Sequence, residues 1–339
     1  MGYAKIAVNG YGTVGRRVGT AVNAQYDMEI VGVVKTRPTF EAMTAIDKGF
    51  DLYVPDSDMI GAFEKAGIEV AGTLDDLLDK VEIVVDCTPN KVGASYKSLY
   101  VEKGVKAIWQ GGEAHELAEF SFNAEANYDD AIDRNLARVV SCNTTGLTRA
   151  LYPLEQEYGV EKARATLIRR AADPGQSNKG PINAIVPALE MPSHHGPDVN
   201  TIMPNIEIAT TAVKVPSTLM HLHGLTVALK NDFEPEDIVD LYEGRPRIYL
   251  VSGGDGVSDT AKIMELSKEL GRSRNDMFEN AIWKDSISKY QGELYLFQAI
   301  HQESDIVPEN VDAIRAMCGL ESDGAKSIAM TNKKMGIGK

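Results

Sequence analysis

Short apolar runs alternate with helix-like stretches in the first half of the chain. The runs are rich in valine and isoleucine, and glycine, proline or polar residues end them. This pattern predicts strands at residues 5–9, 29–34, 83–89, 106–110 and 138–140. Strands that alternate with helices are typical of a doubly wound parallel sheet, in which the turns after the strands line the ligand crevice. We therefore expect an α/β domain over residues 1–141.

Longer strands dominate the second half. Alternating and β-branched residues predict strands at 206–215, 220–229 and 293–300, and helical spacing predicts helices at 260–270 and 309–318. These long strands indicate an α+β domain with a mostly antiparallel sheet. No linker or low-complexity segment separates the halves. The domain change is expected at residue 142, and the second domain is predicted to cover 142–303.

A glycine-rich turn joins the first predicted strand to the first predicted helix. Gly10, Gly12 and Gly15 have the GxGxxG spacing. Between a strand and a helix, this is the fingerprint of Rossmann-type dinucleotide-binding domains. Gly10 would make the tight turn, Gly12 would let the pyrophosphate approach, and Gly15 would let helix and strand pack closely. A glycine turn without a ligand is the alternative, and the context favours the dinucleotide.

The residues after the second strand bear on which dinucleotide is bound. NAD-selective sites usually carry a carboxylate about 20 residues beyond the fingerprint, where it binds the ribose 2′-hydroxyl. This chain has Lys35, Thr36 and Arg37 there. Because these residues could bind a 2′-phosphate, NADP is predicted to be accepted, in preference to NAD. The alternative is an exposed basic turn before Pro38.

Cys142 is the candidate nucleophile. It lies between a strand that ends at Val140 and the stretch 147–158, which has helical spacing. The free N–H groups and dipole of a helix start favour an anion, so we expect a stabilised thiolate there. Asn143, Thr144 and Thr145 are expected to supply capping oxygens and further small polar groups. The alternative is a buried structural cysteine.

Two basic clusters follow Cys142. Arg169 and Arg170 are neighbours on a predicted strand, so their side chains point to opposite faces and one of them is expected to bind an anionic substrate. His194 and His195 lie in a loop rich in serine, glycine and proline. Asp198 alone offers a further ligand at suitable spacing, so no metal site is expected.

A second histidine pair, His221 and His223, lies on a predicted strand. Residues two apart on a strand face the same side, so either histidine could face the thiol as a general acid or base. Spacing alone does not choose between them. Gln302, at the end of a later strand, is a candidate contact for a nicotinamide amide, with a plain loop glutamine as the alternative.

Composition excludes several classes of function. The chain has 339 residues with 43% hydrophobic residues, and its net charge is −14. This charge argues against nucleic-acid binding, because phosphate repulsion would act over the whole surface. No apolar run approaches membrane-spanning length and no signal peptide is visible, so a cytoplasmic protein is expected. Three scattered cysteines suggest neither disulfides nor a zinc site.

The motifs together resemble the archaeal branch of phosphorylating glyceraldehyde-3-phosphate dehydrogenases. The resemblance covers essentially the whole chain and includes NGYGTVG from Asn9, SCNTTGLTR from Ser141, RRAADP from Arg169, SHHGPDV from Ser193 and LMHLHG from Leu219. It implies a Rossmann-type cofactor domain that binds NADP or NAD, a catalytic domain and a homotetramer. It also implies that residues 304–339 form a C-terminal helix that packs back on the first domain.

The resemblance also assigns roles to single residues. Cys142 corresponds to the nucleophile, and the substrate site includes Ser141, Asn143 and Thr144. Cofactor contacts are implied at Thr13, Val14, Gly112 and Gln302. Phosphate recognition is implied at Arg170, His194 and His195. No histidine occurs between Cys142 and His194, unlike in the bacterial and eukaryotic branch, and the archaeal pattern points to His221 as the acid–base residue.

The implied reaction is the oxidation of glyceraldehyde 3-phosphate with inorganic phosphate. Cys142 would attack the aldehyde, a histidine would remove the hydroxyl proton as the hemithioacetal is oxidised, and phosphate would release 1,3-bisphosphoglycerate from the thioester. One alternative is another cysteine-dependent enzyme, such as aspartate-semialdehyde dehydrogenase. A different class is a dinucleotide-sensing protein without activity.

Overall fold

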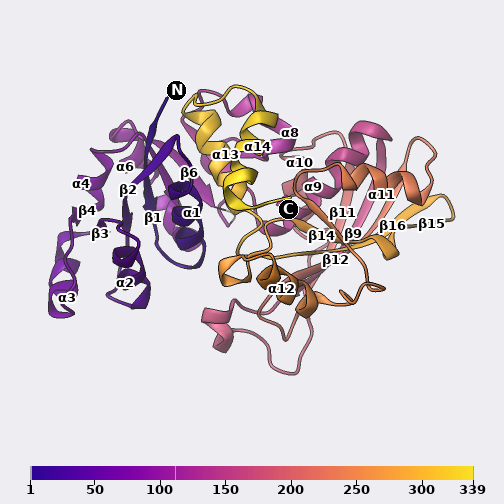
Figure 1. Cartoon of the computed structure of the whole chain (residues 1–339), viewed down its shortest axis with the longest axis horizontal. Coiled ribbons are helices and arrows are strands. Elements are labelled where there is room, and N and C mark those ends of the chain that lie inside the picture. The colour runs from indigo at the N-terminus through magenta and orange to yellow at the C-terminus, as the bar shows by residue number, and fades with distance from the viewer. Residues whose placement is uncertain (1, 111, 339) are drawn as a thin grey trace. The chain divides into compact units, whose positions relative to one another are not determined.

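The computed structural model describes residues 2–110 and 112–338, and it leaves out the side chains of Ser177 and Asn178. Gly111, which precedes the predicted cofactor contact Gly112, lies outside the described residues. The chain divides into two compact units (Figure 1). The first consists of Met1–Ser141 and Val307–Met335, and the second of Cys142–Ile306 and Gly336–Lys339.

The first unit is built on a sheet whose described strand pairs are all parallel, which confirms the predicted doubly wound fold. Its strands follow the order β4-β3-β2-β1-β5-β6-β8-β7. They are β1 (Ala4–Asn9), β2 (Met28–Val34), β3 (Leu52–Val54), β4 (Gly72–Thr73), β5 (Ile83–Asp86), β6 (Lys106–Gln110), β7 (Ser121–Phe122) and β8 (Leu136–Val139). All residues of β5 are buried, as expected for a strand covered on both faces.

Helices connect these strands. They are α1 (Thr13–Asn23), α2 (Phe40–Asp47), α3 (Ile60–Lys65), α4 (Leu74–Leu78), α5 (Val92–Ser95), α6 (Lys97–Glu102), α7 (His115–Ala118) and α8 (Ala124–Asn127). Short 3₁₀ segments are η1 (Ser57–Met59) and η2 (Asp129–Ala131). Two further helices come from the end of the chain, α13 (Val307–Met317) and α14 (Gly324–Met335), drawn in yellow in Figure 1.

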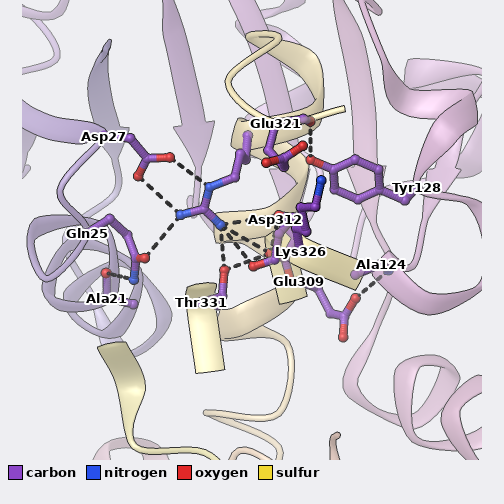
Figure 2. A network of polar contacts seen from close by, with 12 residues as sticks. Ala21, Gln25, Asp27, Ala124, Tyr128, Glu309, Asp312, Glu321, Lys326 and Thr331 are labelled. Carbon is purple, nitrogen blue, oxygen red and sulfur yellow. Dashed lines mark hydrogen bonds and ion pairs between the residues drawn. The ribbon is translucent and has the colours of Figure 1, made fainter. Parts of the chain in front are cut away.

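Arg315 of α13 is fully buried and belongs to a polar network in the first unit, whose members Gln25, Asp27, Asp312 and Thr331 are labelled in Figure 2. Its guanidinium donates to both carboxylate oxygens of Asp27, at 2.8 and 3.1 Å, and to Gln25 at 3.1 Å. It also donates to Thr331 of α14 at 2.7 Å and to Asp312 at 3.4 Å. Since Gln25 and Asp27 lie between α1 and β2, the network fastens both C-terminal helices to the start of the chain.

The second unit contains a mixed, mostly antiparallel sheet, which confirms the predicted α+β character. The pairs β11–β9 and β13–β14 are parallel. The strand order is β10-β11-β9-β12-β16-β14-β13, with β15 paired to β16. The strands are β9 (Val160–Arg170), β10 (Val186–Pro187), β11 (Glu207–Val215), β12 (His221–Leu229), β13 (Ile248–Val251), β14 (Asn280–Trp283), β15 (Ser288–Tyr290) and β16 (Glu293–Ile300).

The helices of this unit are α9 (Cys142–Glu157), α10 (His195–Asn200), α11 (Pro235–Glu243) and α12 (Thr260–Glu269). Short 3₁₀ segments are η3 (Pro174–Lys179), η4 (Ser273–Asn275) and η5 (Lys284–Ser286). The core joins α9 to one face of the sheet, since Leu147 and Leu151 share a buried cluster with Leu167 of β9 and Leu225 of β12. A side chain at Gly146 would meet Ile300 at 2.8 Å, so glycine there allows the close approach of α9.

Two boundaries differ from the sequence expectation. The helix predicted at 147–158 begins at Cys142, so Asn143 and Thr144 lie inside its first turn instead of capping it. Both are buried, which stabilises the first turn although neither residue is a strong helix former. At the other end of the chain there are two helices instead of one, and residues 304–306 and 336–339 group with the second unit.

Candidate active site

The first unit has a cradle for a dinucleotide between β1 and α1. Gly10 has a φ of +95°, and a Cβ atom there would lie 2.8 Å from the backbone of Cys87 and Thr88. A Cβ atom on Gly15 would lie 2.1 Å from the Gly10 carbonyl oxygen, whereas one on Gly12 would meet nothing within 4 Å. The space at Gly12 and the crowding at the other two glycines fit a pyrophosphate at the start of α1.

The other predicted phosphate contacts of this unit lie in the first turn of α1 and directly after β2. Thr13 and Val14 form the first turn of α1. Lys35 directly follows β2, where Thr36 and Arg37 are exposed. The Lys35 ammonium lies 3.6 Å from the Glu41 carboxylate, and both side chains are largely buried. A 2′-phosphate at this position would therefore share Lys35 with an acidic neighbour.

Two further predicted cofactor contacts belong to different units. Gly112 of the first unit follows β6, and its N–H donates to the Gln110 carbonyl oxygen at 2.7 Å. Gln302 of the second unit is buried, and its amide oxygen accepts from Met220 N–H at 2.8 Å. Its amide nitrogen donates to the Thr218 carbonyl oxygen at 3.1 Å. The same nitrogen lies 3.3 Å from an Asp173 carboxylate oxygen. A nicotinamide amide could therefore donate to the second lone pair of the Gln302 oxygen, whereas a contact through the Gln302 nitrogen would have to replace one of its bonds.

Cys142 opens α9, on the helix-covered face of the second sheet. Leu167 of β9 and His223 of β12 are directly opposite each other and buried. Side chains two residues apart share a face, so Arg169 and His221 continue this face toward the strand ends. The predicted nucleophile, one arginine and the predicted histidine pair therefore belong to one side of one sheet. Ser141 ends the first unit, and Thr144 is fully buried in α9.

His223 is bonded through both ring nitrogens. Its Nε2 lies 3.0 Å from the Asn143 amide oxygen, and the Gln298 amide nitrogen lies 3.1 Å from its Nδ1. The Asn143 amide nitrogen in turn lies 3.8 Å from the Cys142 sulfur. Burial, with the charge of Arg169, lowers the pKa of His223 to about 3. This ring is therefore neutral at physiological pH.

His221 has a different environment. Its Nδ1 accepts the backbone N–H of Arg170 at 3.1 Å, so the proton of the neutral ring is on Nε2. Burial, followed by the neighbouring His223 and Arg170, holds the pKa of His221 well below its usual value. In this tautomer Nε2 is a hydrogen-bond donor. Removal of a proton by Nε2 requires the opposite tautomer, which the Arg170 bond disfavours.

The two adjacent arginines differ in their partners, which sequence reasoning left open. The Arg170 side chain donates to the Asp173 carboxylate at 2.9 Å. Arg169 is mostly buried and its Nε has no hydrogen-bond partner. Burial lowers the pKa of Arg169 and the Cys142 thiolate would raise it, so the two groups are near each other. Arg169 therefore offers an unused cationic donor beside the candidate nucleophile.

His194 and His195 stack at the start of α10, with ring centroids 3.9 Å apart. His194 is exposed, whereas His195 is buried and its Nδ1 lies 3.1 Å from the Ser193 hydroxyl. Burial, followed by the charges of His194 and Arg169, lowers the pKa of His195 to about 3. Its interaction with Arg169 connects this pair to the face that carries Cys142.

Comparison with known proteins places the chain in a family. The family model described as glyceraldehyde 3-phosphate dehydrogenase, C-terminal domain, matches residues 141–286, and dihydrodipicolinate reductase, N-terminus, matches residues 4–121. A glyceraldehyde-3-phosphate dehydrogenase of Methanococcoides burtonii is 60% identical over 338 residues, which cover 99% of this chain and 100% of the relative. The chain belongs to the glyceraldehyde-3-phosphate dehydrogenase family.

Other members of the glyceraldehyde-3-phosphate dehydrogenase family agree over the same length. Those of Methanosarcina mazei and Methanothermus fervidus are 57% and 55% identical, and each match covers 98% of this chain and at least 98% of the relative. A crystal structure of aspartate semialdehyde dehydrogenase II from Vibrio cholerae has a TM-score of 0.65 at 13% identity and covers 98% of this chain and 99% of its own. At that identity the similarity shows the fold alone.

One electrostatic expectation for this family member is wrong. Although Cys142 is partly exposed, desolvation of its sulfur, followed by the charge of Asp305, raises the thiol pKa to about 12. Arg169 and Arg170 lower this pKa without compensating for the burial. The resting group at neutral pH is therefore the thiol, whereas the sequence predicted a stabilised thiolate.

Sequence reasoning also missed polar residues that support the site of this dehydrogenase family member. Gln298 bonds His223, and Asn280 donates to the Gln298 amide oxygen at 2.9 Å. One signal was available, since Gln298 interrupts an otherwise apolar stretch of β16.

Among the described residues, no group of histidine, cysteine and acidic side chains is arranged to hold a metal ion. No helix in the described part of the chain combines the length and apolarity needed to cross a bilayer.

Proposed function

We propose that this protein oxidises glyceraldehyde 3-phosphate with NADP or NAD and inorganic phosphate, giving 1,3-bisphosphoglycerate through a thioester on Cys142. One observation carries the proposal. Cys142 begins α9 with an amide nitrogen of Asn143 at its sulfur and the unused donor of Arg169 nearby. This is a nucleophile beside an anion-binding group, as a phosphorylated aldehyde requires. The names of relatives at up to 60% identity support the same substrate.

His221 is the proposed acid–base residue. Its Nε2 is the proton-bearing atom, and it suits the oxygen that becomes negative when the sulfur adds to the aldehyde. Because burial keeps the ring neutral, it donates to this oxygen without carrying a full charge. As the sulfur–carbon bond forms, the carbonyl double bond opens onto its oxygen, and the thiol proton passes to that oxygen, which becomes the hydroxyl of the hemithioacetal. Arg169 and Arg170 lower the thiol pKa and so favour this proton transfer.

Arg169 is the proposed principal contact for a phosphate group, ahead of Arg170. Its Nε is buried without a partner, whereas Arg170 already binds Asp173. His194 and His195 stack near this arginine as polar rings, and the lowered pKa of His195 leaves its ring neutral. Arg169→Leu should raise KM for glyceraldehyde 3-phosphate or inorganic phosphate more than Arg170→Leu does. Equal KM values in the two variants would contradict this order.

The cofactor is proposed to lie in the first unit, on Gly12, Thr13 and Val14, with the basic segment Lys35–Arg37 at the 2′-position. When bound, the nicotinamide dinucleotide accepts the electrons of the oxidation. A charge-assisted contact should favour NADP over NAD by about ten- to a hundred-fold. Lys35→Ala and Arg37→Ala should reduce this ratio. Glu41→Gln, which releases Lys35 from its ion pair, should increase it.

Titration of each variant with NADP and with NAD measures this preference. An unchanged ratio in Lys35→Ala and Arg37→Ala would show that these residues do not contact the 2′-phosphate. The predicted contacts of Gly112 and Gln302 are part of the same proposal. Gln302→Leu should weaken cofactor binding, because it removes the amide oxygen that can accept from the nicotinamide in addition to Met220 N–H, and unchanged binding would contradict this contact.

A homotetramer is proposed as the form of this protein in solution. A segment beside the edge strand β10 exposes several large apolar side chains, at 44–89% of their surface: Ile182, Ile185, Val186, Leu189 and Met191. A second copy of the chain would cover such a surface. The mass in solution, by light scattering, tests this assembly, and a monomer would contradict it. A cytoplasmic location stays a prediction from the sequence.

Trapping of the acyl intermediate tests the proposed reaction. With glyceraldehyde 3-phosphate and NADP but no inorganic phosphate, the thioester should accumulate on Cys142 because the second half of the reaction is blocked. Mass spectrometry should find one 3-phosphoglyceroyl group on the peptide that contains Cys142, and phosphate should remove it. A modified Cys87 or Cys318, or no adduct, would contradict the proposal. Aspartate semialdehyde as the better acyl donor would favour the rival enzyme class.

A further inference from the structure

We infer that Gln298 and His223 are positioning residues, which hold the Asn143 amide with its nitrogen toward the Cys142 sulfur. The inference rests on the proposed role of Cys142 as the nucleophile. It assigns His223 a purpose that requires no proton transfer. Gln298, His223 and Asn143 are buried, and they come from β16, β12 and α9 of the second unit.

Gln298, His223 and Asn143 form a series of hydrogen bonds that ends at Cys142. The Gln298 end of this series is fixed by the backbone of Gly146. The Gln298 amide nitrogen donates to the Gly146 carbonyl oxygen at 3.0 Å and to His223 Nδ1 at 3.1 Å. The Gln298 amide oxygen accepts from Asn280, which also donates to Gly146 at 2.7 Å. A flipped Gln298 amide would place its oxygen against the Gly146 oxygen. Only one orientation satisfies these buried groups.

The fixed orientation of Gln298 determines the next two groups. Because Gln298 donates to Nδ1, the neutral ring of His223 carries its proton on Nε2. Nε2 therefore donates to the Asn143 oxygen, at 3.0 Å. The Asn143 nitrogen is left to face the sulfur, at 3.8 Å. A donor thus points at the atom that gains negative charge, and an amide flip would replace it with an oxygen.

This polarity helps Cys142 in two steps of the proposed reaction. A donor at the sulfur stabilises the thiolate before attack, and again when phosphate displaces it from the thioester. Because burial raises the thiol pKa to about 12, even a weak donor fixed at the sulfur increases the small fraction of thiolate. His223 stays neutral at physiological pH and its Nδ1 is occupied, so it supplies alignment and not a base.

Two substitutions of His223 separate alignment from proton transfer. His223→Gln can accept from Gln298 and donate to Asn143 while removing the titratable ring. His223→Leu removes both bonds. We expect iodoacetamide to alkylate Cys142 within about threefold of the wild-type rate in His223→Gln. The rate should fall by about tenfold in His223→Leu and in Gln298→Met. Gln298→Met breaks the same series of hydrogen bonds and serves as the test if His223→Leu fails to fold.

The rate is measured on the peptide that contains Cys142, between about pH 7 and pH 10. Thr226→Val, on the same strand but the opposite face, is the control and should match wild type. Alkylation at the wild-type rate in His223→Leu or Gln298→Met would overturn the inference. So would a His223→Gln rate as low as that of His223→Leu, because it would make the imidazole itself necessary.

A double variant tests whether His223 acts through Asn143. If it does, Asn143→Ala with His223→Leu should alkylate no more slowly than Asn143→Ala alone, whereas multiplied losses would refute the connection. Iodoacetamide needs neither aldehyde nor cofactor. A normal alkylation pattern without dehydrogenase activity would therefore contradict the proposed function alone, and dehydrogenase activity with an altered pattern would contradict the positioning chain alone.

Discussion

The Cys142 thiol shows how two local effects compete. A helix start stabilises a nearby anion by about 0.3–1 kcal/mol, which is less than one unit of pKa. Burial of a titratable group shifts its pKa by up to several units. The sequence indicated the helix start but not the burial of the sulfur. It therefore predicted a lowered thiol pKa, whereas the pKa is raised. Residues far apart in sequence create that enclosure.

His221 should be the histidine whose loss affects turnover most. Its Nε2 carries the proton of the neutral ring, whereas both ring nitrogens of His223 are bonded to Asn143 and Gln298. His221→Asn should lower kcat by about 10²–10⁴-fold with a modest change in KM. His195→Asn should instead raise KM for the triose phosphate or for inorganic phosphate. Steady-state kinetics of the variants measure both effects.

The pH profile gives a second measure of the same assignment. Because the pKa of His221 is well below its usual value, protonation of this ring should not produce a loss of kcat near pH 6.5. A clear loss there in wild type, absent in His221→Asn, would contradict the buried neutral ring. If His223→Gln proved as damaging to kcat as His221→Asn, the two histidines would have to exchange roles.

Elements were predicted better than their ends. Apolar strands such as β1 and β5 and the glycine turn between β1 and α1 follow from local sequence alone. The start of α9 did not, because Cys142 and the two residues after it favour a helix only when tertiary packing buries them. Gln298 was missed for a similar reason, since its partners come from three other elements.

The attachment of the C-terminal helices should depend on Arg315. Arg315→Met would leave the Asp27 and Asp312 carboxylates buried without their cation. Breaking a buried ion pair in this way costs about 3–5 kcal/mol. Urea unfolding followed by the fluorescence of Trp109, which lies in the first unit, should show that loss.

The control for this variant is an exposed ion pair on the same part of the chain. The Lys326 ammonium lies 3.5 Å from the Asp323 carboxylate, and the two side chains expose 68% and 44% of their surfaces. Lys326→Met should cost less than about 1 kcal/mol. A loss in Arg315→Met no larger than in Lys326→Met would show that the network of Figure 2 does not stabilise the first unit.

The stability of the second unit should fall in mild acid. His195, His221 and His223 are buried, and desolvation lowers the pKa of each in the folded state. Below about pH 6.5 the unfolded chain binds protons that the folded chain does not. Their stabilising contribution is therefore complete above that pH and is lost as the pH falls toward the folded pKa values. With up to three such protons, the free energy of unfolding falls by up to about 4 kcal/mol per pH unit.

Trp283, in the second unit, reports this unfolding when Trp109 is replaced by phenylalanine. The free energy of unfolding should be lower at about pH 5.5 than at about pH 7.5. His223→Gln should reduce the slope by about 1.4 kcal/mol per pH unit, since one proton is removed from the balance. Equal stability at the two pH values would contradict the neutral state of these rings.

The central claim is that Cys142 carries an acyl group which inorganic phosphate must remove. The most direct measurement is NADP reduction with glyceraldehyde 3-phosphate, with and without inorganic phosphate, in wild type and in Cys142→Ala. Wild type should turn over steadily with phosphate or arsenate and stop after about one equivalent without either, and Cys142→Ala should be inactive. Steady reduction of NADP by Cys142→Ala, or full wild-type turnover without phosphate and arsenate, would contradict the account.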